Sequence, residues 1–207
     1  MTHLLAAFQG LLRCKRFLGA CLLGFATILP AAAASVVPLY LDEIIDRSAV
    51  AFEGVCLENR TEREASTGWI VTYTTFEVRD VLKGGVSATH VIKQLGGTLA
   101  AEGLAYQIPG IPKFVVGESY VVFLAGVSSA GFSSPVGLAQ GQFSITQGPA
   151  GREVTNGVDF NDLTARMPDN ALAAGLMKGS KRSTGTVRSL DIDQFKQMVR
   201  ERAGMQK

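Results

Sequence analysis

The residues best suited to covalent chemistry are Cys56 and His90, a thiol and an imidazole that could act as nucleophile and base. Such catalysis also needs a third group that orients the base, and no recognisable signature surrounds either residue. Cys56 lies in an apolar stretch, where a free cysteine is often buried. We therefore interpret Cys56 as a core residue, and a small hydrolase with a Cys56–His90 site remains the alternative.

Other chemistries find little support in the pattern of residues. A zinc site needs three or four Cys, His or carboxylate ligands, and one Cys and one His far apart in sequence fall short. Gly84–Gly85 and Gly96–Gly97 lack the spacing of a phosphate-binding loop, and turns explain both pairs. The adjacent carboxylates Asp42–Glu43 lie in an expected helix, where a solvated face accounts for them. The sequence therefore predicts no catalytic residues, no metal site, no cofactor and no enzymatic activity.

Residues 1–34 are typical of an export signal peptide. Three basic residues lie within positions 13–16, an apolar run follows at 17–29, and residues 31–34 are alanines that fit a cleavage region. The apolar run is shorter than the about 20 residues that a membrane-spanning helix needs. We expect cleavage, a periplasmic or extracellular location and no stable membrane span afterwards. An uncleaved anchor and a lipid anchor at Cys21 are the alternatives.

Removal of the signal changes both the charge and the cysteine count. Three of the 20 basic residues and none of the 18 acidic ones are lost, which leaves 17 against 18 and a net charge of −1. A nearly neutral domain gives no electrostatic reason to bind nucleic acid. Cys56 is then the single cysteine, so an intramolecular disulfide is excluded. The remaining chain of about 170 residues is long enough to bury a core without one.

The stretch from Trp69 to Gly97 predicts a β-hairpin, which we take as the central element of the fold. Alternate residues of its first strand share an inner face: Ile70, Thr72, Thr74, Phe76 and Val78. The alternation breaks at Arg79–Asp80, where a β-bulge would return Val81 to the core. Lys83–Gly85 then supplies the turn.

The rest of the chain up to residue 156 is expected to complete a small five-stranded barrel. Three further segments are expected to be its strands: Ala49–Leu57, Glu118–Ala125 and Gly137–Thr146. Arg152–Thr155 is expected to pair back onto the fifth strand as a hairpin. A short N-terminal helix is expected at Tyr40–Ser48, because its apolar residues recur at helical spacing. Asn59–Gly68 is expected to be a charged, solvated loop. The fold class is therefore mainly β, with the barrel domain at residues 35–156.

A C-terminal helix is predicted after a linker. Apolar residues become sparse across residues 157–188, which favours a flexible segment. Residues 189–203 are expected to be helical, with Asp191 as the N-cap. Phe195 and Val199 belong to an apolar stripe that we expect to dock on the barrel, and a partner-binding helix is the alternative.

Five segments carry a resemblance to known proteins: AVAFEGVCLENR, TYTTFEVRDVLKGG, THVIKQLGG, FVVGESYVVFL and GLAQGQFSI. They resemble a widespread group of uncharacterised exported bacterial proteins. More distantly, the strand order is similar to the netrin-like, or tissue-inhibitor-of-metalloproteinase-like, OB fold, through Val50, Phe52 and Gly54 and a long strand that ends in Lys83–Gly84. The resemblance implies an OB-like barrel. Inhibitors of that fold resemble one another in an N-terminal zinc-binding cysteine and several disulfides, which this chain lacks, so the resemblance leaves the activity open.

Together these features predict an exported, non-catalytic binding module that interacts with, or regulates, an exported protein such as a protease. The candidate binding surface consists of four aromatic residues: Trp69, Tyr73, Tyr106 and Phe114. The loops at residues 59–68 and 98–114 complete this surface. A structural role through the terminal helix is a further alternative.

Overall fold

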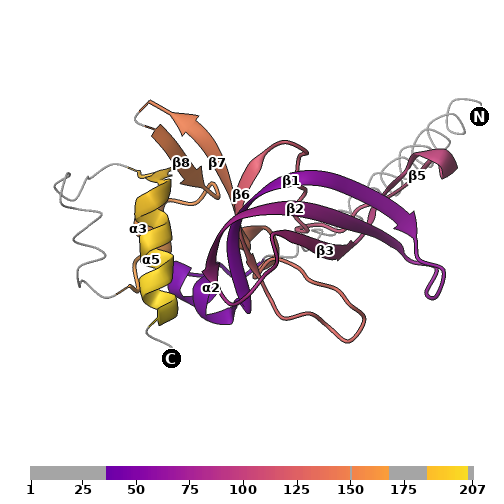
Figure 1. Cartoon of the computed structure of the whole chain (residues 1–207), viewed down its shortest axis with the longest axis horizontal. Helices are drawn as coiled ribbons and strands as arrows, with labels where there is room; N and C mark the ends of the chain where they lie inside the picture. Colours follow the sequence, from indigo (N-terminus) through magenta and orange to yellow (C-terminus); the bar gives the residue numbers. More distant parts are fainter. Residues whose placement is uncertain (1–35, 150, 168–185, 205–207) are drawn as a thin grey trace, which may run out of the picture. The chain divides into compact units, whose positions relative to one another are not determined.

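A computed structural model describes residues 36–149, 151–167 and 186–204 of the chain (Figure 1). The expected signal peptide and residues 168–185 of the expected linker lie outside the described residues. The chain divides into two units, Met1–Val36 and Val37–Lys207, and all that follows concerns the second. Within the described ranges, no helix is both long enough and apolar enough to cross a membrane.

The fold is mainly β, as the sequence predicts, and its largest element is a seven-stranded antiparallel sheet. Across the sheet the strands run in the order β3 (Thr89–Leu95), β2 (Ile70–Lys83), β1 (Val50–Arg63), β6 (Ser119–Leu124), β7 (Gln142–Gly148), β8 (Gly151–Thr155) and β9 (Leu190–Asp191). A separate two-stranded ribbon consists of β4 (Gly97–Leu99) and β5 (Leu104–Tyr106). The helices are α2 (Leu41–Arg47), α3 (Phe160–Leu163) and α5 (Ile192–Gly204), with short 3-10 turns at η1 (Ala100–Glu102) and η2 (Leu138–Gly141).

The expected closed five-stranded barrel is not observed. In the described part of the chain, β3 and β9 are the two ends of the sheet, and no ladder joins them. Closure would require the last strand of the set to pair with the first. The strand that could do so, β7, is instead paired on both edges, with β6 and with β8. The sheet therefore stays open and extends through β8 and β9.

The hairpin predicted at Trp69–Gly97 is confirmed as β2 and β3, which pair in antiparallel register. The predicted bulge lies at Arg79, in the pairing of β2 with β1. Glu53 pairs with Asp80 and Gly54 with Val78, so Arg79 has no partner in the ladder. The expected consequence for Val81 is wrong, because Val81 remains exposed. The bulge instead turns Asp80 toward the face of the sheet that carries α5, where it forms an ion pair with Lys196.

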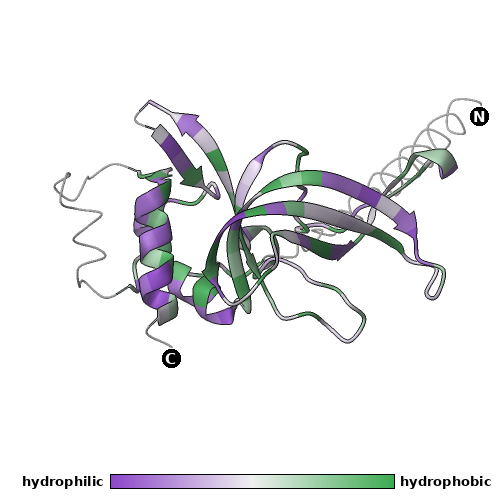
Figure 2. Cartoon of the chain, viewed as in Figure 1, coloured by the Kyte–Doolittle hydropathy of each residue, from purple (hydrophilic) through white to green (hydrophobic). Residues whose placement is uncertain are grey.

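Each face of the sheet has its own apolar core. On one face, side chains from β1, β6 and β7 pack against α2, α3 and α5, with Phe123, Phe143 and Phe195 at the centre. On the other face, Phe52 and Phe76 belong to a second cluster with β3 and β6. Figure 2 shows that β1 changes from hydrophobic to hydrophilic colours toward its C-terminal end. The second core therefore stops part of the way along the hairpin.

The C-terminal helix docks on the sheet, as its apolar stripe predicts. The Oδ1 atom of Asp191 accepts hydrogen bonds from the backbone N–H groups of Asp193 and Gln194, both at 3.0 Å, which confirms the predicted N-cap. Phe195 and Val199 are fully buried. Because this stripe is already covered, it does not offer a partner-binding surface.

Several element boundaries differ from the sequence-based expectation. The first strand runs on to Arg63, so half of the expected loop at residues 59–68 is paired with β2. The strand expected at Gly137–Thr146 begins with η2 and becomes extended at Gln142. The segment expected to be a linker contains α3, whose Phe160 and Leu163 are buried. In each case pairing or packing with distant residues overrides the local preference.

Candidate functional site

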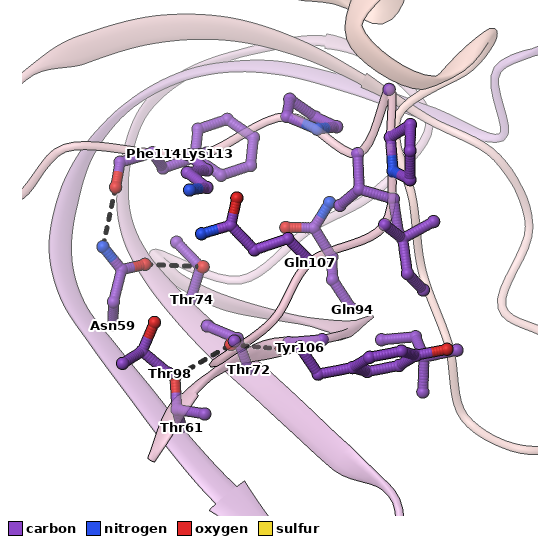
Figure 3. Close-up of a pocket in the computed structure, with 18 residues that line it drawn as sticks. Asn59, Thr61, Thr72, Thr74, Gln94, Thr98, Tyr106, Gln107, Lys113 and Phe114 are labelled. Carbon is purple, nitrogen blue, oxygen red and sulfur yellow. Dashed lines mark hydrogen bonds between the residues drawn. The ribbon is translucent and has the colours of Figure 1, made fainter. Parts of the chain in front are cut away.

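A polar pocket lies on the face of the sheet that carries the second core, beyond the end of that core. We call this the inner face. Its floor consists of side chains from β1, β2 and β3. The opposite wall is formed by residues of the segment from Gly96 to Phe114 (Figure 3). The cavity volume is about 500 Å³, within the range of about 300–1,000 Å³ that is usual for small-molecule sites.

The floor is built from two cross-strand rows of side chains. Thr61, Thr72 and Gln94 lie opposite one another on β1, β2 and β3. The adjacent row contains Asn59 and Thr74. Period-2 alternation places these rows on the same face as Phe76, so the inner face changes from apolar to polar along the hairpin.

Hydrogen bonds fix the orientation of most floor side chains (Figure 3). Asn59 accepts from the Thr74 hydroxyl at 2.7 Å and donates from Nδ2 to the Phe114 carbonyl at 2.7 Å, which ties β1 to the loop. The Thr72 hydroxyl donates to the Gly96 carbonyl at 2.7 Å and lies 2.9 Å from the Thr61 hydroxyl. These bonds preorganise the floor before any ligand arrives.

Gln94 is the exception among the floor residues. Its side chain is only 4% exposed, yet among the described residues its Nε2 atom has no hydrogen-bond partner. A buried amide without a partner costs about 1–3 kcal/mol. Figure 3 shows the amide of Gln94 entering the pocket from the sheet and that of Gln107 entering it from the loop. Gln94 therefore lines the pocket, and its buried Nε2 atom is a donor that no described protein group satisfies.

Two glycines allow the chain to fold back over the floor. Gly96 and Gly97 have φ values of 95° and 146°, a region that residues with a side chain rarely adopt. A Cβ atom on Gly97 would lie 2.5 Å from Thr61 Cγ2 and would also overlap the Thr72 hydroxyl. The Gly96–Gly97 pair, interpreted from the sequence as turn glycines, thus allows the wall segment to lie close to the floor threonines.

The loop wall is uncharged except at one position. Lys113 is the one charged residue among those that line the pocket, and its backbone carbonyl is held by Gln142 Nε2 at 3.0 Å. Tyr106, at the end of β5, is 48% exposed. Two prolines, Pro109 and Pro112, lie between them and contribute no backbone donor.

The four aromatic residues of the predicted binding surface do not come together. Tyr106 and Phe114 both line the pocket, although Phe114 is buried in the second core. Trp69 is 49% exposed and lies against Phe132, with ring centroids 6.0 Å apart. Tyr73 alternates with the floor threonines and therefore lies on the opposite face of β2, beneath the Arg60 guanidinium.

Sequence reasoning missed the polar floor residues. Thr72 and Thr74 were recognisable as inner-face positions, and polar residues at such positions are a signal for a site or a buried network. Asn59 was hidden because its charged surroundings resemble a loop. Gln94 follows Ile92 by two residues, which marks it as an inward position of β3.

Cys56 and His90 lie on the same face of the sheet but in a row with Phe76 between them. Cys56 pairs with Phe76, which in turn pairs with His90. Strands are about 4.8 Å apart, so two strand spacings separate the two backbones. Burial raises the pKa of the Cys56 thiol and lowers the pKa of His90. The first shift favours an uncharged thiol and the second an uncharged imidazole, whereas a nucleophilic cysteine needs a lowered pKa.

The described residues contain no group of three or more His, Cys, Asp or Glu side chains arranged to hold a metal ion. Fold and site thus define a mainly β protein with one helix-covered sheet face and, on the other face, a polar pocket with one charged lining residue. Comparisons with family models, with curated proteins and with solved structures find no match.

Proposed function

We propose that the protein is an exported, non-catalytic binding module whose ligand occupies the polar pocket. The proposal rests on one observation above the others, the buried and unpartnered amide nitrogen of Gln94. Buried polar groups in native proteins are nearly always hydrogen-bonded. An exception that faces a cavity of about 500 Å³ is most simply explained by a ligand that supplies the acceptor.

The rest of the pocket supports the same function. Asn59 and Thr72 are already held by hydrogen bonds, so a ligand meets a rigid floor. Preorganisation lowers the entropy lost on binding. The exported location is proposed from the features of residues 1–34.

The hydrolase alternative has weaker support. Phe76 stands between Cys56 and His90 in the cross-strand row, and the Cys56 Sγ atom lies 4.0 Å from Asn59 Oδ1 and from the Glu58 carbonyl. A nucleophile and its base must lie within hydrogen-bonding reach of each other. A protease-regulating role, in turn, rests on the netrin-like resemblance alone.

Screening by NMR tests the proposal. The purified full-length protein is titrated with a library of small, uncharged polar fragments, and ¹H–¹⁵N spectra are recorded. We expect shifts of the Gln94 side-chain NH₂ and of the Gly96 and Gly97 amides. The Gln94→Leu variant should lose the shifts of the Gly96 and Gly97 amides, whereas Cys56→Ala should keep all three. Shifts confined to other surfaces, or turnover of an ester or peptide reporter that Cys56→Ala abolishes, would contradict the proposal.

A further inference from the structure

The lining of the pocket selects against charged ligands. Of its residues only Lys113 carries a charge, and that side chain is on the loop wall, not on the floor. An ionic ligand would lose its hydration without a countercharge beneath it, which is costly. The ligand that fits this lining is polar and uncharged.

The hydrogen-bonding groups of the floor are hydroxyls and amides. Thr61, Thr74 and Asn59 are side chains that both donate and accept, and Gln94 offers an unused donor. A sugar hydroxyl also donates and accepts, so it can pair with any of them. Neighbouring strands hold these groups about 4.8 Å apart and alternate residues about 6.8 Å apart, which gives a two-dimensional array. Such an array suits a ring with several hydroxyls better than a linear chain with one polar group.

Tyr106 supplies the apolar part of such a site. Its ring is half exposed at the edge of the pocket, where Figure 3 shows it lying alongside the floor. The face of an aromatic ring carries partial negative charge and attracts polarised C–H groups. The C–H face of a pyranose ring can therefore pack on Tyr106 while its hydroxyls point to the floor.

An extended peptide, the main competitor, finds few backbone partners in the pocket. Peptides that bind along a sheet use unpaired backbone groups of an edge strand. In the floor, β2 is paired on both edges, with β1 and with β3, so it presents only side chains. On β3, the end strand, the Lys93 carbonyl already accepts a hydrogen bond from the Ser133 N–H. On the loop wall, Pro109 and Pro112 remove two backbone donors.

From these contacts we infer that the pocket binds a neutral saccharide, which Gln94 holds by a hydrogen bond from Nε2 and Tyr106 by packing on its ring. This inference rests on the proposed function, since it names the ligand class for the same pocket. A cavity of about 500 Å³ has room for a mono- or disaccharide unit. The unit can belong to a longer glycan, because the pocket is open to solvent at Tyr106.

Two probe panels test the inference on the purified full-length protein by calorimetry and ¹H–¹⁵N NMR. One contains neutral di- and trisaccharides of glucose, galactose, mannose and N-acetylglucosamine, and the other contains uncharged tripeptides with blocked ends. We expect at least one saccharide to bind and to shift the Gln94 side-chain NH₂. Gln94→Leu and Tyr106→Ala should each weaken that binding by about tenfold or more, which corresponds to about 1.4 kcal/mol.

Two control variants keep the test specific. Tyr106→Phe retains the ring and should bind within about threefold of the parent protein. Tyr73→Ala removes a tyrosine from the opposite face of β2 and should also leave binding unchanged. Binding of the tripeptides at Gln94 without any saccharide binding overturns the saccharide assignment and leaves the pocket a binding site. Failure of both panels and of the fragment library overturns the proposed function as well.

Discussion

Glu53 and Asp80 are direct cross-strand partners on β1 and β2, and the ammonium group of Lys196 bridges them. The Nζ atom lies 2.9 Å from Glu53 Oε2 and 3.0 Å from Asp80 Oδ2. Two carboxylates at directly opposed positions would repel each other. A cation from α5 between them removes that repulsion and fixes the helix on the sheet. Arg152 and Arg200 complete the cluster from either side.

Loss of the bridging ammonium should destabilise the fold. Lys196→Met leaves Glu53, only 4% exposed, beside a second carboxylate. Removing one partner of a buried ion pair costs about 3–5 kcal/mol, and because Arg152 and Arg200 remain we expect about 2–4 kcal/mol. Urea unfolding followed by circular dichroism measures the change.

An exposed ion pair provides the matched control for this variant. Arg60 pairs with Glu62, and both side chains are largely solvent-exposed. Arg60→Met should change the free energy of unfolding by less than about 1 kcal/mol. Equal losses for Arg60→Met and Lys196→Met would show that burial of the cluster contributes nothing.

The same cluster should make stability sensitive to acid. Burial raises the pKa of Glu53 and Asp80, but hydrogen bonds from Lys196, Arg152 and Arg200 outweigh it, so both pKa values lie below the ordinary 4.5 and 3.8. A lowered folded-state pKa contributes stability that is present above the unfolded-state value and is lost as the pH falls through the folded-state value. The urea concentration at the unfolding midpoint should therefore stay constant near neutral pH. It should decrease once the pH is lowered below 4.5.

The double variant Glu53→Gln/Asp80→Asn isolates this contribution. It removes both titrating groups of the cluster, so the urea midpoint should decline less steeply below pH 4.5 than that of the parent protein. Parallel decline in the two proteins would assign the acid sensitivity to other carboxylates.

Gln94→Leu should stabilise the protein while it abolishes ligand binding. The amide nitrogen is buried without a partner, and an apolar side chain of similar size removes that penalty. We expect the free energy of unfolding to rise by about 1–3 kcal/mol in the absence of ligand. Thermal and urea unfolding measure this change beside the NMR titrations described above.

The matched control is Thr74→Val, at a floor position whose hydroxyl is already bonded to Asn59. Because that variant breaks an existing hydrogen bond, it should lower the free energy of unfolding by about 0.5–1.5 kcal/mol. Destabilisation by Gln94→Leu of the same size would mean that the Gln94 amide is satisfied within the protein.

The parts of this fold that the sequence predicts are those set by local pattern. Alternation predicts the β2–β3 hairpin, and Asp191 with the stripe at Phe195 predicts α5 and its docking. The openness of the sheet was not predictable in this way. It depends on β7 pairing with β8 instead of closing on β3, which is a long-range choice between strands of similar character.

The candidate site shows the same limit. Tyr106 could be predicted as a binding residue because it is an aromatic residue in a long irregular segment. Gln94 and Asn59 also line the pocket, but no local pattern marks them. Their significance arises from register: Gln94 matters because Thr72 and Thr61 lie beside it in one row. Register between strands depends on bulges, which change the facing of every later residue.

The pocket wall should depend on the absence of a side chain at Gly97. Its φ of 146° is unfavourable for other residues, and an added Cβ would overlap Thr61 and Thr72. Strain and overpacking each cost about 1–3 kcal/mol, so we expect Gly97→Ala to lower the free energy of unfolding by about 2–4 kcal/mol.

The control is Gly85→Ala, where an added Cβ has no neighbour within 4 Å. That variant should be neutral or slightly stabilising, because alanine restricts the unfolded chain. Similar unfolding free energies for the two variants would show that Gly96–Gly97 does not determine the position of the pocket wall. The loop at Pro109–Pro112 would then be the segment that shapes the pocket.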